Sequence, residues 1–167
     1  MDFLIEEEGL LAQSPLDVVE HVLAAENLPF DRTDDEGLAF ALPGDWKEFE
    51  LWFSWRPDAG CLQLCLALDL KVETKTFGPL YELLALVNQK SHMGHFELWP
   101  EDGEVMFRYA LPLPEGERPT TAQAAAMIDA AMESGDRFYP AFSFLLERGK
   151  SPKEAMAACL FETVGRA

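Results

Sequence analysis

Basic residues are scarce in this chain, which has 13 lysines and arginines against 30 aspartates and glutamates in 167 residues. The net charge of −17 repels phosphate backbones and anionic lipid surfaces, so it argues against nucleic acid and membranes as partners. No apolar run approaches the roughly 18 residues of a membrane span. The stretch from Met1 to Glu8 is acidic, where a signal peptide is basic. These absences predict a cytoplasmic protein.

Cysteine is sparse as well. The three cysteines, Cys61, Cys65 and Cys159, form no Cys-x-x-Cys pair, so neither a disulfide framework nor a zinc ribbon is indicated. A reactive thiolate needs a nearby histidine or a helix N-terminus to lower its pKa, and the pattern offers neither. We therefore interpret the cysteines as small packing residues.

Histidine is rare, and the common catalytic motifs are absent. His92 and His95 form a His-x-x-His pair near Glu97, but Gly94 lies between them, and a closed metal site needs about four placed ligands. The chain has no Gly-rich phosphate loop, no Gly-x-Ser-x-Gly elbow and no His-Glu-x-x-His helix. We therefore predict that the protein is not an enzyme and has no catalytic residues, no cofactor and no metal site.

Alternation of apolar residues is the strongest signal that is present. Five leucines occupy every second position of one predicted strand: Leu62, Leu64, Leu66, Leu68 and Leu70. This period of two specifies one buried face of a sheet. Further strands are predicted at residues 30–34, 38–42 and 49–55, and the short loops between them imply antiparallel pairing.

The stretch 80–113 predicts a helix followed by a hairpin. Apolar residues first recur at helical spacing, and Gly94 is the predicted helix stop. Asp102-Gly103 then separates two alternating runs, which is a strong hairpin signal. Asn88 lies near the helix end, where we expect its side chain to hydrogen-bond neighbouring backbone.

Helices are also predicted at both ends of the chain. Ser14-Pro15 is typical of a helix start. Thr120 or Thr121 caps an Ala-rich helix that Pro140 should kink or break. The spacing from Ser151 to Glu154 is that of a capping box, which opens a last helix.

The sequence thus predicts an α+β protein with an antiparallel sheet and packed helices, in the order α-β-β-β-β-α-β-β-α-α. Its length predicts one domain over residues 1–167. Within it, residues 1–13 form a lead-in and residues 120–167 contain the C-terminal helices.

The face of the sheet opposite the leucines is unusually apolar for a surface in water. Small or apolar residues on it include Ala39, Ala41, Trp52, Cys65, Ala67, Trp99, Met106 and Ala110. We favour cover by the chain's own later helices, because domains usually bury apolar faces within themselves. The alternative is an open groove or a homodimer face with Trp52 and Trp99 as anchors, since aromatic residues are enriched at interface hot spots.

Several segments resemble one protein family. They are residues 83–89, Gly94 to Trp99, Val105 to Arg108, Asp136 to Phe142, Gly149 to Pro152 and Phe161 to Gly165. In these segments the chain resembles the YbjN-domain family of bacterial sensory transduction regulators, in its alphaproteobacterial branch, from about Pro15 onward. It departs from the family at residues 90–93, where a more apolar stretch is expected.

The resemblance implies a fold similar to that of type III secretion chaperones, but it carries no reaction or catalytic motif. We therefore predict a cytosolic, non-enzymatic protein-binding module, a YbjN-like regulator or chaperone-like adaptor of unidentified partner. Trp52, Trp99, Phe138 and Tyr139 are the predicted partner-binding residues. The alternatives are a dedicated type III secretion chaperone, and a small-ligand-binding protein or uncharacterised enzyme.

Overall fold

The computed structural model describes residues 14–164, so the predicted lead-in at residues 1–13 lies outside them. The elements in chain order are α2 (Pro15–Ala25), β1 (Phe30–Arg32), β2 (Gly37–Pro43), β3 (Glu48–Arg56), β4 (Cys61–Ala67), the short 3-10 helix η1 (Thr74–Thr76), α3 (Phe77–Asn88), β5 (His95–Trp99), β6 (Glu104–Pro112), α4 (Thr121–Leu146) and α5 (Pro152–Val164). This confirms the predicted α+β class and the predicted element order.

The strands form one antiparallel sheet of six strands in the order β1-β2-β3-β4-β6-β5. The leucines of β4 lie in the middle of it, where Leu64 is between Phe53 of β3 and Tyr109 of β6. A slip of one residue would turn every leucine of β4 to the other face, so the alternation fixes the register.

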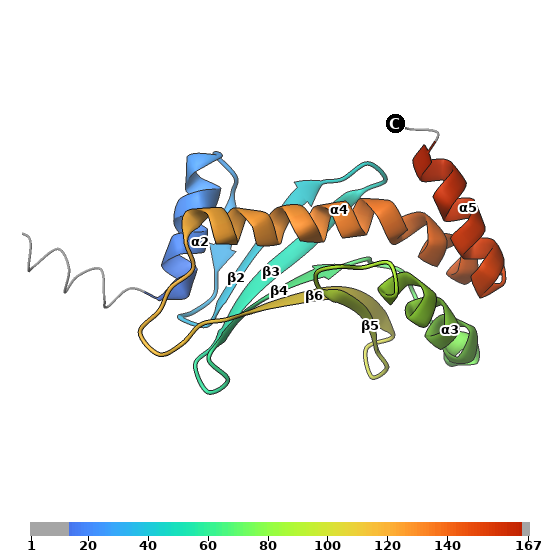
Figure 1. The fold of residues 1–167 in the computed structure, drawn as a ribbon, viewed down its shortest axis with the longest axis horizontal. Coiled ribbons are helices and arrows are strands. Elements are labelled where there is room, and N and C mark those ends of the chain that lie inside the picture. Colours follow the sequence, from blue (N-terminus) through green and yellow to red (C-terminus); the bar gives the residue numbers. More distant parts are fainter. Residues whose placement is uncertain (1–13, 165–167) are drawn as a thin grey trace, which may run out of the picture.

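The helices gather on the face that carries these leucines. In Figure 1, α2 and α4 lie along one side of the sheet, while α3 and α5 pack together at the end near β5. Helix α4 approaches closely at Gly135, where an added Cβ would lie 3.2 Å from the side chain of Leu66. Phe96 of β5 packs against Phe138 and Phe142 of α4, so one hydrophobic core joins the sheet to the helices.

Two local predictions were wrong, and the structure excludes a break at Pro140, one of the two alternatives given for that position. Helix α3 ends at Asn88 rather than at Gly94. Strand β4 ends at Ala67, although Leu68 and Leu70 stay buried beyond it. Helix α4 runs unbroken through Pro140, which is buried. At Pro140, packing in the core stabilises a helix that the local signal alone would interrupt.

The turn that leads from α3 into β5 depends on Asn88 and Gly94. The Asn88 side chain donates to the Phe96 carbonyl at 2.9 Å and accepts from the Phe96 N–H at 2.7 Å, which confirms its predicted role. Gly94 has φ +72°, and a Cβ there would lie 2.3 Å from the Phe107 ring. The chain can enter β5 in this way only with glycine at position 94.

The substitution Gly94→Ala should therefore be strongly destabilising. The left-handed backbone conformation costs a non-glycine residue about 1–2 kcal/mol, and the clash with Phe107 adds to it. We expect a loss of at least about 2 kcal/mol in the free energy of unfolding, measured by urea denaturation.

Gly78→Ala is the matched control, because an added Cβ at that helical position meets nothing within 4 Å. We expect it to be neutral or to stabilise by at most about 1 kcal/mol. Equal effects of the two substitutions would contradict the role given to Gly94.

Candidate functional site

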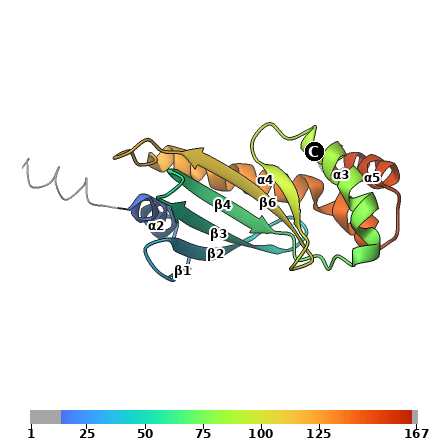
Figure 2. The ribbon, with the colours of Figure 1, turned by 90° about the horizontal axis from the view of Figure 1, so that it is seen from below.

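One face of the sheet is directed away from α2 and α4. In Figure 2 the strands lie in front of α4, and no helix in the described part of the chain covers them on this side. We call it the open face, and its residues, taken from alternate strand positions, are Asp31, Gly37, Ala39, Ala41, Pro43, Glu48, Glu50, Trp52, Ser54, Arg56, Cys61, Gln63, Cys65, Ala67, His95, Glu97, Trp99, Glu104, Met106, Arg108, Ala110 and Pro112.

The expectation that later helices cover this face was wrong. Helix α4 packs on the opposite face, and α5 packs on α3 and α4. The physical reason is that the opposite face carries the leucines and phenylalanines, whose burial stabilises the protein more than burial of alanines does.

Trp52 and Trp99 meet on the open face. Their ring centroids are 6.3 Å apart, and the rings are tilted by 71° in an edge-to-face contact. Strands β4 and β6 lie between β3 and β5, and the register places Trp52 level with His95, four residues along β5 from Trp99, so the two tryptophans are related diagonally across the sheet. The indoles therefore lean toward each other over β4 and β6. This accounts for the low exposure of Cys65 and Met106, at 5% and 3%, on a face without a helix.

Glu97 holds the indole of Trp99 in position. Its Oε1 accepts a hydrogen bond from Trp99 Nε1 at 2.6 Å, and its Oε2 lies 2.8 Å from Arg108 Nη2 and 3.0 Å from His95 Nε2. Burial alone would raise the pKa of Glu97, but the hydrogen bonds from Trp99 and His95 and the charge of Arg108 outweigh it. The pKa is lowered below 4.5, so Glu97 is ionised at neutral pH.

The thiols are poor nucleophiles in this environment. Burial raises the pKa of Cys65 to about 11 and that of Cys159 to about 11, so both stay protonated at neutral pH. Cys159 Sγ also donates to the Arg137 carbonyl at 2.8 Å. These contacts agree with the packing role inferred from the sequence.

The other two predicted partner-binding residues lie on the far side of the sheet from the tryptophan pair. Phe138 is 2% exposed, and its ring centroid is 5.9 Å from that of Phe96. Tyr139 is partly buried, with its ring edge-on to Phe49 at 6.0 Å. The structure thus groups Trp52 with Trp99 and places Phe138 in the core, which corrects its predicted role because a core side chain has no surface to offer.

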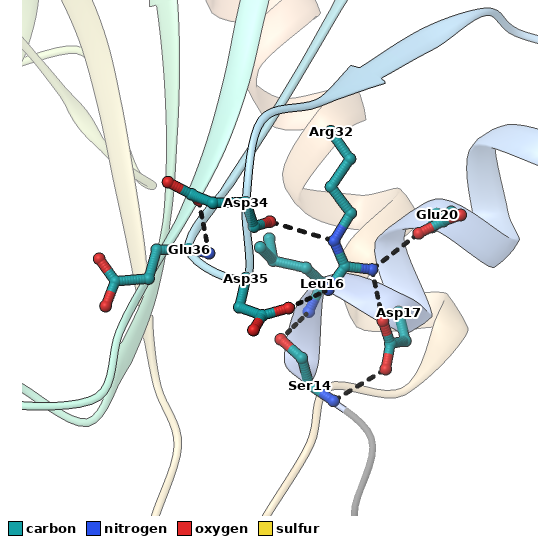
Figure 3. Close-up of polar contacts among 8 residues, drawn as sticks. All are labelled: Ser14, Leu16, Asp17, Glu20, Arg32, Asp34, Asp35 and Glu36. Atoms are coloured by element: carbon teal, nitrogen blue, oxygen red, sulfur yellow. Dashed lines mark hydrogen bonds and ion pairs between the residues drawn. The ribbon is translucent and has the colours of Figure 1, made fainter.

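A polar cluster joins α2 to β1 (Figure 3). Arg32 Nη1 lies 2.5 Å from Asp17 Oδ1 and 2.8 Å from Glu20 Oε2, and Arg32 Nε donates to the Asp34 carbonyl at 3.2 Å. Hydrogen bonds to Asp17 and Glu20 raise the pKa of Arg32, which keeps its charge. Hollows of about 510 and 690 Å³ adjoin this cluster. Because the guanidinium is already bonded on several sides, the cluster ties the helix to the sheet.

The histidines do not converge on a site. His92 and His95 are both exposed, and His95 bonds Glu97. Within residues 14–164, no group of three or more His, Cys, Asp and Glu residues could hold a metal ion. In the same part of the chain, no helix combines the length and apolarity needed to cross a bilayer.

The turn from α3 into β5, the tryptophan pair and most of α4 lie in a region that a family model matches. The model is YbjN, described as "Putative bacterial sensory transduction regulator", and it matches residues 15–144. The chain belongs to the YbjN family. The resemblance seen in the sequence is therefore confirmed, while the alphaproteobacterial branch stays a prediction. No curated protein matches the chain.

Solved structures with a similar fold include YbjN family and chaperone structures. The ExsC-ExsE complex contains a chain with 16% identity and a TM-score of 0.53, over 78% of this chain and 91% of that one. YbjN from E. coli has 13% identity and a TM-score of 0.52, over 71% and 84%. The HopA1-SchA chaperone–effector complex contains a chain with 16% identity and a TM-score of 0.50, over 71% and 88%. At these identities the likeness shows the fold alone.

The contacts of the ionised Glu97 side chain with Trp99, Arg108 and His95 give a pH-dependent prediction. A carboxyl with a lowered pKa contributes stability above its ordinary pKa and loses it as the pH falls through the lowered value. We expect Glu97→Gln to cost about 0.5–1 kcal/mol at pH 7, because the group is partly solvated and screened. The difference from the unmodified protein should vanish as the pH falls below 4.5, measured by urea denaturation at several pH values.

Glu48→Gln removes the same charge from the open face at an exposed position. It should change stability by less than about 0.5 kcal/mol at every pH. If the difference in the free energy of unfolding between Glu97→Gln and the unmodified protein stays constant down to acid pH, the role given to the ionised Glu97 is excluded.

Proposed function

We propose that this protein is a non-enzymatic protein-binding module, a YbjN-type regulator or chaperone-like adaptor, whose open face holds a segment of a partner protein. One observation carries the proposal: a sheet face left uncovered by residues 14–164 carries a tryptophan pair, formed by Trp52 of β3 and Trp99 of the edge strand β5. Both indoles are partly exposed. Apolar surface that stays accessible in this way marks interaction sites, and tryptophan is enriched among residues that dominate binding energy.

The structural neighbours support a protein partner. Two of them were solved as complexes, one of ExsC with ExsE and one of the chaperone SchA with its effector HopA1. The complex of SchA with HopA1 supports a narrower candidate, a dedicated secretion chaperone. Such a chaperone differs from a regulator because the client that it holds is later exported.

A role as a small-ligand-binding protein or enzyme has less support. The hollows beside Arg32 are lined by charged groups that bond one another, and the thiols of Cys65 and Cys159 stay protonated at neutral pH. The proposal includes a cytoplasmic setting, in keeping with three free thiols.

Site-specific photo-crosslinking in cells tests the proposal. The photoreactive residue p-benzoylphenylalanine would replace Ala39 or Ala110, which are both exposed on the open face, or Ala126, which is exposed on α4. We expect Ala39 and Ala110 to give the same crosslinked protein, identified by mass spectrometry, and Ala126 to give none.

Trp52→Ala, combined with either crosslinking position, should reduce the yield of that product several-fold, because it removes a central anchor. Tyr81→Ala is the control, since Tyr81 is 54% exposed on α3, outside the open face. The proposal would be refuted if the crosslinker at position 126 gave as much product as at positions 39 and 110, or if Trp52→Ala left the yield of crosslinked product unchanged. A crosslink to a second copy of the chain would show that the open face is a homodimer interface instead.

A further inference from the structure

The open face has a depression of about 410 Å³ beside Trp52. Its floor includes Ala39 and Ala41 of β2, and its borders include Asp31 of β1 and Glu50 and Trp52 of β3. The register explains the shape, because Ala39 lies between Asp31 and Trp52, and Ala41 lies opposite Glu50. Strands β1 and β3 are about 10 Å apart on either side of β2, so two alanines leave a space between longer side chains.

Among the described residues, the two carboxylates at the border of this depression have no cationic partner. The arginines of the open face are already engaged, Arg108 with Glu97 at 2.8 Å and Arg56 with Asp58 at 3.7 Å. Neither Asp31 nor Glu50 has an ion pair within residues 14–164. The depression therefore presents two carboxylates beside the Trp52 side chain, in a chain whose net charge is −17.

We propose that the open face selects a basic protein segment, with one lysine or arginine side chain lying in this depression between Asp31 and Glu50. The methylene stem would cover the alanines, and the cationic head would lie near both carboxylates and the ring of Trp52. Lysine and arginine lay their methylene stems along apolar surface and keep the charged head in water, where it can meet the carboxylates. The inference rests on the proposed function, because it names the chemistry of the partner held by the open face.

Charge complementarity favours this occupant over a second copy of the chain. In a two-fold dimer the same patch lies on both sides of the interface, so open face would meet open face. The open face carries five carboxylates and two arginines, so two copies would bring like charges together. A basic segment instead meets opposite charge, and it is also steered toward the acidic protein from a distance.

The test uses defined peptides, so it does not depend on finding the natural partner. The peptides are acetyl-Val-Lys-Val-amide and its uncharged counterpart with norleucine in place of lysine. Binding would be followed by shifts of the backbone amide signals of Ala39 and Ala41 and the indole N–H signal of Trp52 in 15N NMR spectra. We expect saturable shifts for the lysine peptide and roughly tenfold weaker binding of the norleucine peptide.

Asp31→Asn combined with Glu50→Gln should remove this preference for lysine. Glu48→Gln combined with Glu104→Gln is the matched control, since it removes the same charge from open-face positions that do not line the depression. It should keep the preference. Circular dichroism would verify that both double variants fold.

Equal binding of the two peptides, absence of binding by both, or equal loss in both double variants would overturn the inference. The crosslinking experiment records a partner of any charge on the open face. The proposed function can therefore survive when the preference for a basic side chain fails, and the two failures are distinguishable.

Discussion

The burial of one sheet face under α4 is the constraint on which the rest of the structure depends. Leu62, Leu64 and Leu66 are fully buried, and the fit is close enough that Gly135 has little room for a side chain. Because strand side chains alternate, fixing these leucines inward fixes every odd-numbered position of β4 outward. The register then carries the same division to the neighbouring strands, so the position of Trp52 on the open face follows from it.

A sheet with helices on one side only has a second face exposed to water, and polar residues normally occupy it. Here the tryptophan pair, the buried Cys65 and Met106 and several alanines make much of that face apolar, and Arg108 and Glu97 lie beside them. Glu97 is bonded to Trp99 and Arg108, which holds one indole in position before any partner arrives. Preorganised aromatic anchors of this kind reduce the entropy lost on binding. Asp31 and Glu50, in contrast, have no ion-pair partner in the described part of the chain, and they border the depression beside Trp52.

The residues that identify the family have structural roles in this protein. Asn88 and Gly94 shape the turn from α3 into β5. Asp136 accepts a hydrogen bond from the Asp45 N–H at 2.7 Å, and Phe138 packs on Phe96, so the segment at residues 136–142 joins α4 to the sheet. This explains why membership of the YbjN family follows clearly from the chain while a specific activity does not. The features that bear on function lie instead on the open face.

The sequence by itself determined the fold class, the order of the elements and the face to which each strand residue belongs. These properties depend on local periodicity, capping residues and turn residues such as Asp102-Gly103. It also placed Trp52 and Trp99 on a common face. The tertiary structure decided which face the helices cover, that α4 continues through Pro140, and that Phe138 is in the core. It also decided that β6 lies between β4 and β5, which places Arg108 opposite Cys65 and leaves β5 at the edge of the sheet. Periodicity tells which side of an element a residue occupies, but only contacts between distant segments decide what covers that side.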